Sequence, residues 1–292
     1  SSFVELLSKN NIKTLALGRK PFDSLADHVK AKIAAATYLE VDMRDIDSVP
    51  AKAKDLQWHP DSDCLFFNLA WGGVNSLSDL DIEAQLNNVD WSVGALEVAS
   101  RLGCIRFVQV GTMEEAFTHK YLALDHNVNS EFNRHVIYSV AKIAAKNSLK
   151  IKANLLNIEF IYLLHSHVMG PHDNKDSFLQ VTLQKLIKSE ELIFSSGEQI
   201  FDVISVEDCV EGYFLACTKG KPGSEYWVGS GNPRSLREYV ERMYALYPSG
   251  KELQFGALPY NDVVLEKSVF SIESLVKDTG FKPKFSYEAT VE

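Results

Sequence analysis

The segment Ile105-Arg-Phe-Val-Gln-Val-Gly-Thr-Met-Glu114 fixes the architecture of this protein. Residues 105–110 are mostly apolar and predict a buried strand, and Gly111 and Thr112 stand where that strand ends. Similar apolar runs alternate with helical patterns through the first half of the chain, which predicts βα units in a doubly wound parallel sheet. Ligands bind at the carboxyl ends of such strands, so the residues after each strand are the candidates for function.

The alternation extends from this segment in both directions. Strands are predicted at residues 13–18, 37–42, 64–70, 105–110 and 152–164, and helices at residues 3–8, 81–102 and 131–149. Beyond residue 164 the pattern of predicted elements changes. Helices are predicted at residues 177–189 and 235–247, and short strands near Leu192, Val203 and Tyr226. The sequence therefore predicts an α/β lobe over residues 1–164 and a smaller α+β lobe over residues 165–292, with segments crossing between them.

Composition and charge narrow the class of protein. The chain has 292 residues, of which 46% are apolar, and its net charge of −9 comes from 39 acidic and 30 basic residues. This excess of negative charge repels phosphate backbones and anionic lipids, so neither nucleic acid nor a membrane surface is an expected partner. No run reaches the roughly 18 apolar residues of a membrane span. Four scattered cysteines (Cys64, Cys104, Cys209 and Cys217) predict buried thiols in a reducing, cytoplasmic compartment.

The residues after the first three strands suit a dinucleotide. Arg19 and Lys20 follow the first strand, where a cation pairs with the 2′-phosphate of NADP and an acid binds the ribose hydroxyls of NAD. A solvated turn is the alternative for these two cations. Asp42 and Met43 offer a carboxylate for the adenine amine and a flat apolar contact. The third strand is followed by residues that let a cofactor approach the backbone, among them Leu69, Ala70 and Trp71.

Tyr138 and Lys142 are four residues apart on a predicted helix and therefore share one face. An ammonium beside a phenol lowers its pKa from about 10, which makes the tyrosine a usable proton donor or acceptor. This spacing is common in helices, where an exposed lysine and a half-buried tyrosine have no catalytic role. Together with Thr112 at a strand end and Arg19 after the first strand, the pair predicts a catalytic site.

Several motifs along nearly the whole chain agree with this interpretation. They are Asn88-Val89, Val168-Met169-Gly170-Pro171, Gly197-Glu198-Gln199, Val206-Glu207-Asp208 and Gly280-Phe281-Lys282-Pro283. With these motifs the chain resembles the extended short-chain dehydrogenase/reductase superfamily, the NAD(P)-dependent nucleotide-sugar epimerases, dehydratases and reductases. Residues 253–260 are similar to the branch of nucleotide-sugar 4-ketoreductases. The resemblance implies a Rossmann-type dinucleotide-binding domain over residues 1–164 and a substrate-binding lobe over residues 165–292.

The resemblance also implies roles for individual residues. Tyr138 is the expected general acid/base, Lys142 lowers its pKa and holds the nicotinamide ribose, and Thr112 hydrogen-bonds the reacting oxygen. The nicotinamide carries the hydride. Further cofactor contacts are implied at Asn88, Val110, His165 and His167, and substrate contacts at Glu114, Ser166, Phe178 and Phe201.

Departures from the family pattern bear on the reaction. Dehydratases of the superfamily carry Thr-Asp-Glu where this chain has Thr112-Met113-Glu114, and a thioether cannot donate the proton that water elimination needs. Two reactions are still compatible with the sequence. One is an NADPH-dependent reduction of a 4-keto-6-deoxy nucleotide sugar, and the other is a C4-epimerisation with tightly bound NAD. Arg19 and Lys20 favour the reductase. A non-catalytic dinucleotide sensor is the third possibility, against which the intact Tyr138 and Lys142 argue.

Other departures concern the substrate and possible metal ligands. Phe201 and Asn261 stand near the positions of two arginines that hold the nucleotide diphosphate in relatives. Lys175, Lys185 or Lys188 would have to replace these arginines, or the substrate is not a nucleotide sugar. The nucleotide sugar remains the favoured expectation.

His165, His167, His172 and Asp173 are close in sequence, which raises the question of a metal site. Their place in a substrate loop explains them better than a metal site does. We expect no metal.

The resemblance leads to two further expectations. The helices at residues 81–102 and 131–149 form a dimer bundle in relatives, so we expect a homodimer.

Relatives open with a strand and a Gly-x-x-Gly-x-x-Gly turn that binds the pyrophosphate. This chain opens on a helical pattern, and its 16 glycines all lie farther along. We expect that the numbered chain omits that strand and its glycine turn.

Overall fold

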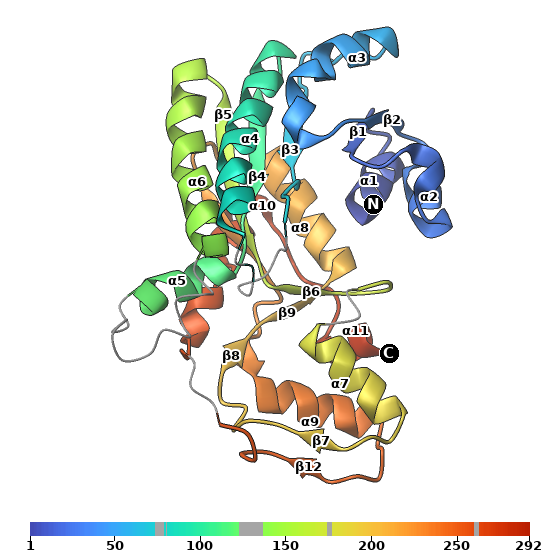
Figure 1. Ribbon diagram of the computed structural model, residues 1–292, viewed down its shortest axis with the longest axis vertical. Helices are drawn as coiled ribbons and strands as arrows, with labels where there is room; N and C mark the ends of the chain where they lie inside the picture. The colour runs from blue at the N-terminus through green and yellow to red at the C-terminus, as the bar shows by residue number, and fades with distance from the viewer. Residues whose placement is uncertain (74–78, 80, 123–136, 174–176, 260–262) are drawn as a thin grey trace.

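A parallel sheet of four strands, in the order β10-β5-β4-β3, is the centre of the fold. The computed structural model describes residues 1–73, 79, 81–122, 137–173, 177–259 and 263–292. The four strands are β3 (Leu65–Asn68), β4 (Arg106–Val110), β5 (Glu159–His165) and β10 (Glu225–Val228). A separate parallel pair, β1 (Leu15–Gly18) with β2 (Thr37–Glu40), lies beside β3 (Figure 1). The predicted parallel α/β architecture is confirmed.

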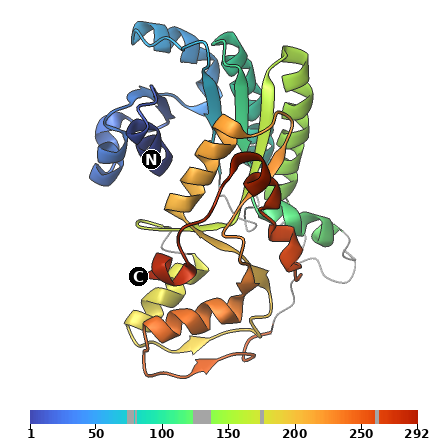
Figure 2. The ribbon, with the colours of Figure 1, turned by 180° about the vertical axis from the view of Figure 1, so that it is seen from behind.

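Helices cover both faces of the four-stranded sheet. On one face α4 (Ile82–Arg101) and α6 (Ile137–Leu156) pack side by side (Figure 1). On the other face α8 (Val206–Lys219) contacts α1 (Ser2–Lys9) and α10 (Glu273–Thr279), as Figure 2 shows. The consecutive residues Phe107 and Val108 of β4 are both fully buried, each in a different apolar cluster. Burial on both faces explains why the strand is mostly apolar.

Short helices connect the strands of the first lobe. They are η1 (Phe22–Ser24), α2 (Asp27–Ile33), η2 (Met43–Ser48), α3 (Val49–Asp55) and α5 (Glu114–Leu122). Asp81 caps α4 by accepting a hydrogen bond from the Ala84 amide, and Gly103, with a φ of 77°, follows the end of that helix. A positive φ favours glycine, which agrees with the predicted stop.

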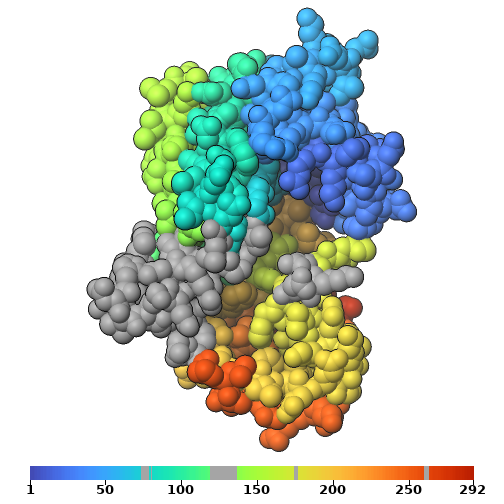
Figure 3. All heavy atoms as spheres, viewed as in Figure 1, coloured from blue at the N-terminus to red at the C-terminus, as the bar shows by residue number. Residues whose placement is uncertain are grey.

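The second lobe has its own apolar core. Its elements are β6 (His167–Met169), α7 (Phe178–Ile187), β7 (Leu192–Ile193), β8 (Ile200–Phe201), β9 (Val203–Ser205), β11 (Arg234–Ser235), α9 (Leu236–Leu246), β12 (Leu253–Gln254) and α11 (Tyr287–Val291). The short helix η4 (Lys267–Phe270) packs instead on the first lobe, where Phe270 contacts Trp227 of β10. Leu179, Tyr239 and Met243 are buried together between α7 and α9. Residues 206–228 return to the first lobe, where α8 covers the sheet and β10 extends it. Figure 3 shows the surface hollowed between the two lobes.

One predicted boundary is wrong. Residues 152–164 were expected to form a strand, but α6 continues to Leu156 and β5 begins at Glu159. Ala153 is buried one turn beyond Leu149, so the helical face persists through an apolar segment that also suits a strand. Asn157 then ends the helix in the left-handed region, with a φ of 52°. The first six residues of the predicted helix at 131–149 lie outside the described residues.

The four cysteines are free thiols. Cys104, Cys209 and Cys217 are buried, as predicted, whereas Cys64 is only half-buried. The Sγ atoms of Cys64 and Cys104 lie 3.2 Å apart at the amino ends of β3 and β4. Within the described part of the chain, no helix combines the length and the apolar composition needed to span a membrane.

Candidate active site at the carboxyl ends of the strands

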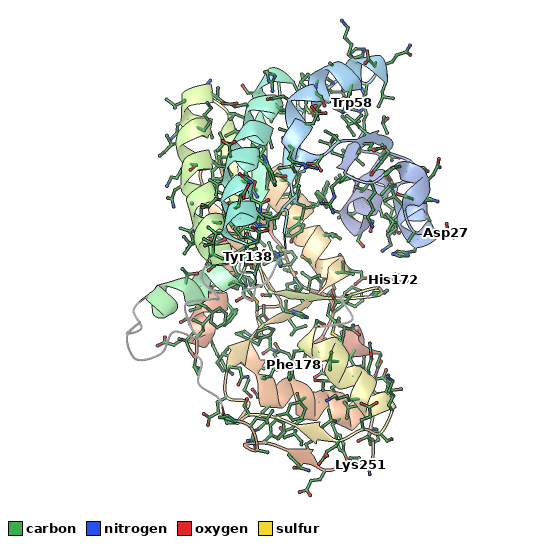
Figure 4. The ribbon with its side chains drawn as sticks, viewed as in Figure 1. Asp27, Trp58, Tyr138, His172, Phe178 and Lys251 are labelled. Carbon is green, nitrogen blue, oxygen red and sulfur yellow. The ribbon has the colours of Figure 1, made fainter. Side chains whose placement is uncertain are left out.

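Thr112, Tyr138 and Lys142 come together at the carboxyl end of the sheet. Thr112 follows β4, and the other two residues lie in the first two turns of α6, where Figure 4 labels Tyr138. All three are buried, with exposed fractions of 6%, 5% and 4%. A hydrogen bond joins the side chains of Thr112 and Tyr138. The spacing in the sequence thus placed a hydroxyl, a phenol and an ammonium in one small region.

The Lys142 ammonium lies against uncharged groups. Its Nζ donates a hydrogen bond to the Val110 carbonyl oxygen, 3.1 Å away, and lies 3.8 Å from the centroid of the Trp71 ring system. Burial lowers the pKa of Lys142 to about 7, and the negative charge of Glu115 opposes this shift. Burial therefore makes Lys142 much easier to deprotonate than an exposed lysine.

The pKa of Tyr138 shifts in the direction opposite to the prediction from sequence. Burial raises it to about 12, the hydrogen bond with Thr112 lowers it, and the charges of Glu114 and Glu115 raise it further. Lys142 is not among the groups that shift the Tyr138 pKa in this arrangement, because its Nζ faces Trp71 and lies 5.9 Å from the Tyr138 ring centroid. Tyr138 is therefore a neutral phenol at physiological pH.

Polar residues of α4 hold the loop after β3 in place. The Trp71 indole N–H donates to Gln85 Oε1 at 2.8 Å, and Gln85 Nε2 donates to Asp79 Oδ2 at 2.6 Å. Asn88 accepts a hydrogen bond from the Gly72 amide at 2.6 Å and donates to the Gly72 carbonyl at 3.0 Å. Asn88, expected at the cofactor, thus fixes the loop backbone. Sequence reasoning missed Gln85, although a polar residue on the buried face of a helix was a usable signal.

The predicted nucleotide-binding residues lie after β1 and β2. Arg19 and Lys20 are exposed, and Met43 begins η2 at the edge of the core. Asp42 pairs with Arg44, whose Nε and Nη2 lie 2.9 and 3.1 Å from the two carboxylate oxygens. These hydrogen bonds lower the pKa of Asp42 to about 2, and the charge of Arg19 contributes. Arg44 is a third cation in this region that the sequence analysis did not single out.

Two of the expected contacts on β5 and β6 are tied into the protein interior. Ser166 is fully buried, donates to Asp202 Oδ2 and accepts a hydrogen bond of 2.8 Å from the Trp227 indole. This network holds its hydroxyl within the core instead of at the expected substrate. His165 Nδ1 lies 2.8 Å from the Ser166 carbonyl oxygen, and burial lowers the pKa of His165 to about 4.

The histidines do not gather into a metal centre. His167 Nε2 lies 3.9 Å from Asp173 Oδ2, and burial lowers the pKa of His167. His172, labelled in Figure 4, stacks on His28 of α2 with 3.9 Å between the ring centroids. Within residues 1–73, 79, 81–122, 137–173, 177–259 and 263–292, no group of three His, Cys, Asp or Glu side chains could hold a metal ion.

The remaining expected residues are spread around the site. The Glu114 amide donates to the Thr112 hydroxyl oxygen at 3.3 Å, and Leu69 and Ala70 are exposed. Phe178, labelled in Figure 4, packs against Phe194 with 5.9 Å between ring centroids. The Phe201 ring centroid lies 5.8 Å from that of His167, Lys185 lies on α7, and Lys188 is the residue that follows this helix. Lys175 and Asn261 lie outside the described residues.

Comparison with known proteins gives one family match and several similar proteins. Residues 1–229 match the NAD dependent epimerase/dehydratase family. CDP-abequose synthase of Salmonella typhimurium is 32% identical over 146 residues, which are 48% of each chain. dTDP-glucose 4,6-dehydratase of Haemophilus influenzae is 26% identical over 110 residues, which are 37% of this chain and 32% of the relative. The chain thus spans about half the length, or less, of these curated relatives.

Solved structures share the fold over almost the whole chain. The UDP-glucose 4-epimerase of Thermotoga maritima, determined with UDP-glucose, superposes with a TM-score of 0.74 at 16% identity, covering 99% of this chain and 93% of the epimerase. RMD of Pseudomonas aeruginosa, complexed with NADPH, superposes with a TM-score of 0.67 at 17% identity and covers 95% of both chains. At such low identities these likenesses establish the fold alone.

The buried ammonium of Lys142 predicts a measurable pH dependence of stability. Its pKa of about 7 lies below the ordinary value of 10.5, so between these pH values the unfolded chain binds more protons. The free energy of unfolding of the native protein minus that of Lys142→Met should therefore rise as the pH increases from 7 to 10. The slope cannot exceed about 1.4 kcal/mol per pH unit.

Urea unfolding at several pH values measures this difference. Lys150→Met, which removes an exposed lysine of the same helix, controls for the loss of a positive charge. A difference that stays flat for Lys142→Met, or that rises equally for Lys150→Met, would show that Lys142 is not desolvated in the folded protein.

Proposed function

The chain belongs to the NAD-dependent epimerase/dehydratase family, and from that premise we propose that it reduces a 4-keto-6-deoxy nucleotide sugar with NADPH. The observation that carries this proposal is the buried cluster of Thr112, Tyr138 and Lys142. Met113, beside Thr112, is buried and has no proton to donate, which argues against water elimination. The likeness to CDP-abequose synthase supports a reaction at the sugar.

The residues of the cluster fit a reduction. When bound, the nicotinamide supplies the hydride. Reduction also consumes a proton, and burial keeps the Tyr138 phenol neutral, with a pKa near 12, so that it has a proton to give to the new alkoxide. The Thr112 hydroxyl, which already hydrogen-bonds Tyr138, orients the same oxygen.

Lys142 fits the ribose of the cofactor. An ammonium has three donors, and among the described residues its one hydrogen bond is to the Val110 carbonyl oxygen. The other two N–H groups are close to the Trp71 face and are available to ribose hydroxyls. A cation that donates to the ribose while staying near Tyr138 also stabilises the phenolate left after proton transfer.

Three cations support NADPH as the cofactor. We assign Arg19 and Lys20 to the 2′-phosphate, and Arg44 adds a third positive charge beside them. Asp42 and Met43 would contact the adenine, although the Asp42 carboxylate is also engaged by Arg44. A guanidinium suits a phosphate because it donates two parallel hydrogen bonds.

The substrate lobe and the cellular setting complete the proposal. We assign residues 1–164, with α8 and β10, to the dinucleotide, and the rest of residues 165–292 to the sugar nucleotide, with Glu114, Phe178 and Phe201 as contacts. Free thiols in close proximity, such as Cys64 and Cys104, agree with the reducing cytoplasm. Nucleotide sugars of this kind supply polysaccharide synthesis, which is the proposed biological role.

We further propose a homodimer formed by α4 and α6. These helices pack side by side and leave large apolar side chains in solvent, among them Ile82 (59% exposed), Leu86 (52%), Ile151 (64%) and Leu155 (76%). Exposed apolar side chains spread along one pair of helices are a feature of protein interfaces. A second copy of the same helix pair would cover them.

The proposed reaction can be measured directly. Purified protein should consume NADPH with at least one member of a panel of nucleotide-linked 4-keto-6-deoxy sugars, and Tyr138→Phe should abolish turnover because it removes the proton donor. NADPH binding by fluorescence should change little, since the hydroxyl is lost but the ring remains. Interconversion of C4 epimers with NAD that survives purification would replace the reductase by the epimerase, and full activity of Tyr138→Phe would refute the catalytic assignment.

The cofactor assignment predicts a selective effect of Arg19→Ala. Loss of a charged hydrogen bond of about 1.5 to 3 kcal/mol should weaken NADPH binding by about ten- to a hundredfold. NADH lacks the 2′-phosphate, so its dissociation constant should stay nearly constant. Lys54→Ala, which removes an exposed cation of α3, is the control and should change neither constant. Equal losses for the two cofactors in Arg19→Ala would contradict the assignment.

The dimer proposal is tested by sedimentation. The native chain of 32.7 kDa should sediment at twice that mass, and Leu86→Glu should sediment as a monomer because it places a charge in the apolar contact. Ile187→Glu changes an equally exposed side chain on α7 and should remain dimeric. A native monomer at micromolar concentration would exclude the proposed interface.

A further inference from the structure

We propose that Glu115 is a positioning residue for the catalytic cluster, fixing both Thr112 and the turn of α6 that carries Lys142 without touching the substrate. The inference rests on the proposed function for its effect on rate, but the positioning itself is a property of the protein alone. Glu115 follows the catalytic segment directly and is 4% exposed. A carboxylate this deeply buried needs partners, and the structure provides them on three sides.

The first contacts of Glu115 are with the strand ends. Its Oε1 accepts a hydrogen bond from the Thr112 backbone amide at 3.1 Å and a second from the Tyr162 hydroxyl at 2.6 Å. Tyr162 belongs to β5 and is 2% exposed. One oxygen atom therefore joins the turn after β4 to the neighbouring strand, at the point where Thr112 leaves the sheet.

The second set of contacts reaches α6. The Tyr162 hydroxyl also lies 3.3 Å from the carbonyl oxygen of Lys142. Glu115 Oε2 pairs with Lys146 Nζ at 3.3 Å, and Lys146, one turn beyond Lys142, also pairs with Glu225 Oε2 of β10 at 3.1 Å. The helix that carries Tyr138 is thus bound to the sheet through Glu115 at the two turns next to the site.

Gly111 gives an independent indication that the backbone is shaped around this contact. A Cβ atom at residue 111 would collide with Glu115 Oε1 and would lie 2.5 Å from the Tyr162 hydroxyl oxygen. Both approaches are far closer than any real contact, so a larger residue would push the carboxylate and the phenol away. The Gly111 amide meanwhile donates to the Leu163 carbonyl at 2.7 Å, which keeps this close approach in place.

Stability alone does not account for the arrangement. Desolvation raises the pKa of Glu115 and thus opposes its charge, while the Tyr162 and Lys146 contacts lower it. Buried ion pairs often contribute no more than an apolar side chain of similar volume would. The two hydrogen bonds of Oε1, together with the ion pair of Oε2 with Lys146, nevertheless hold these groups in one geometry. Thr112 and Glu115 also have the spacing of a capping box, in which the acid accepts from the backbone amide three residues earlier.

The proposal predicts a loss of rate that a matched tyrosine variant does not share. Glu115→Ala should lower kcat by about ten- to a hundredfold with little change in KM, since small displacements of catalytic groups cost that much. Glu115→Gln retains an oxygen that accepts from Thr112 and Tyr162, and it should restore kcat to within about threefold, because the ion pair with Lys146 is lost but both hydrogen bonds of Oε1 remain. Tyr162→Phe, which breaks the link to Lys142, should lower kcat in the same way.

Tyr226→Phe is the control for Tyr162→Phe. Tyr226 is 1% exposed on the adjacent strand β10, and its hydroxyl also donates to a carboxylate, Asp278 Oδ2, at 2.9 Å. It should retain the native kcat per folded molecule. If kcat falls as much in Tyr226→Phe as in Tyr162→Phe, or if Glu115→Ala keeps the native kcat, Glu115 has only a structural role. Should Glu115→Ala fail to fold, Tyr162→Phe and Glu115→Gln decide the question.

Hydrogen exchange separates this inference from the proposed reaction. The Thr112 amide should exchange faster in Glu115→Ala and keep its native protection in Glu115→Gln and Tyr226→Phe. Unchanged protection in Glu115→Ala would overturn the positioning role whatever the enzyme does. A native protein that reduces no sugar would refute the proposed function, while faster exchange in Glu115→Ala would still support the role of Glu115 in holding Thr112.

Discussion

The burial of the Lys142 ammonium determines how the carboxyl end of the sheet is built. An ion taken out of water loses several kcal/mol of solvation unless nearby groups replace it. Here the replacement comes from the Val110 carbonyl oxygen at 3.1 Å and the Trp71 face at 3.8 Å. The Trp71 ring is held in turn by a hydrogen bond from its indole N–H to Gln85 of α4. The loop after β3 and the end of β4 therefore take positions that serve one buried cation.

The sequence predicts the sheet and the central site because both depend on local patterns. Buried strands and amphipathic helices have short periods that can be recognised without tertiary contacts. Thr112 stands at a strand end, and Tyr138 and Lys142 share a helical face, so topology alone brings them to one edge of the sheet. The end of α6 escaped prediction because Ala153 and Leu156 suit a strand as well as a helix, and only packing against α4 decides between them.

Other features depend on side chains that are far apart in the sequence. Ser166 was expected at the substrate, but Asp202 and Trp227 draw its hydroxyl into the interior. The direction of the Tyr138 pKa shift was wrong because spacing on a helix does not say where a lysine side chain turns. A four-residue separation makes a contact possible, whereas the rotamer is chosen by neighbours from other elements, here Trp71 and Val110.

The opposite pKa shifts of Tyr138 and Lys142 have a common physical meaning. Burial raises the pKa of the phenol to about 12 and lowers that of the ammonium to about 7, so both groups favour their neutral forms. A proton given up by Tyr138 leaves a phenolate in a region of low polarity, where its attraction for a nearby cation is stronger than in water. That charge would favour protonation of Lys142, and the two groups would then titrate as a pair. Burial thus keeps a neutral phenol beside an amine that a phenolate would help to protonate from solvent, an arrangement that suits the proposed transfer of a proton to the substrate oxygen.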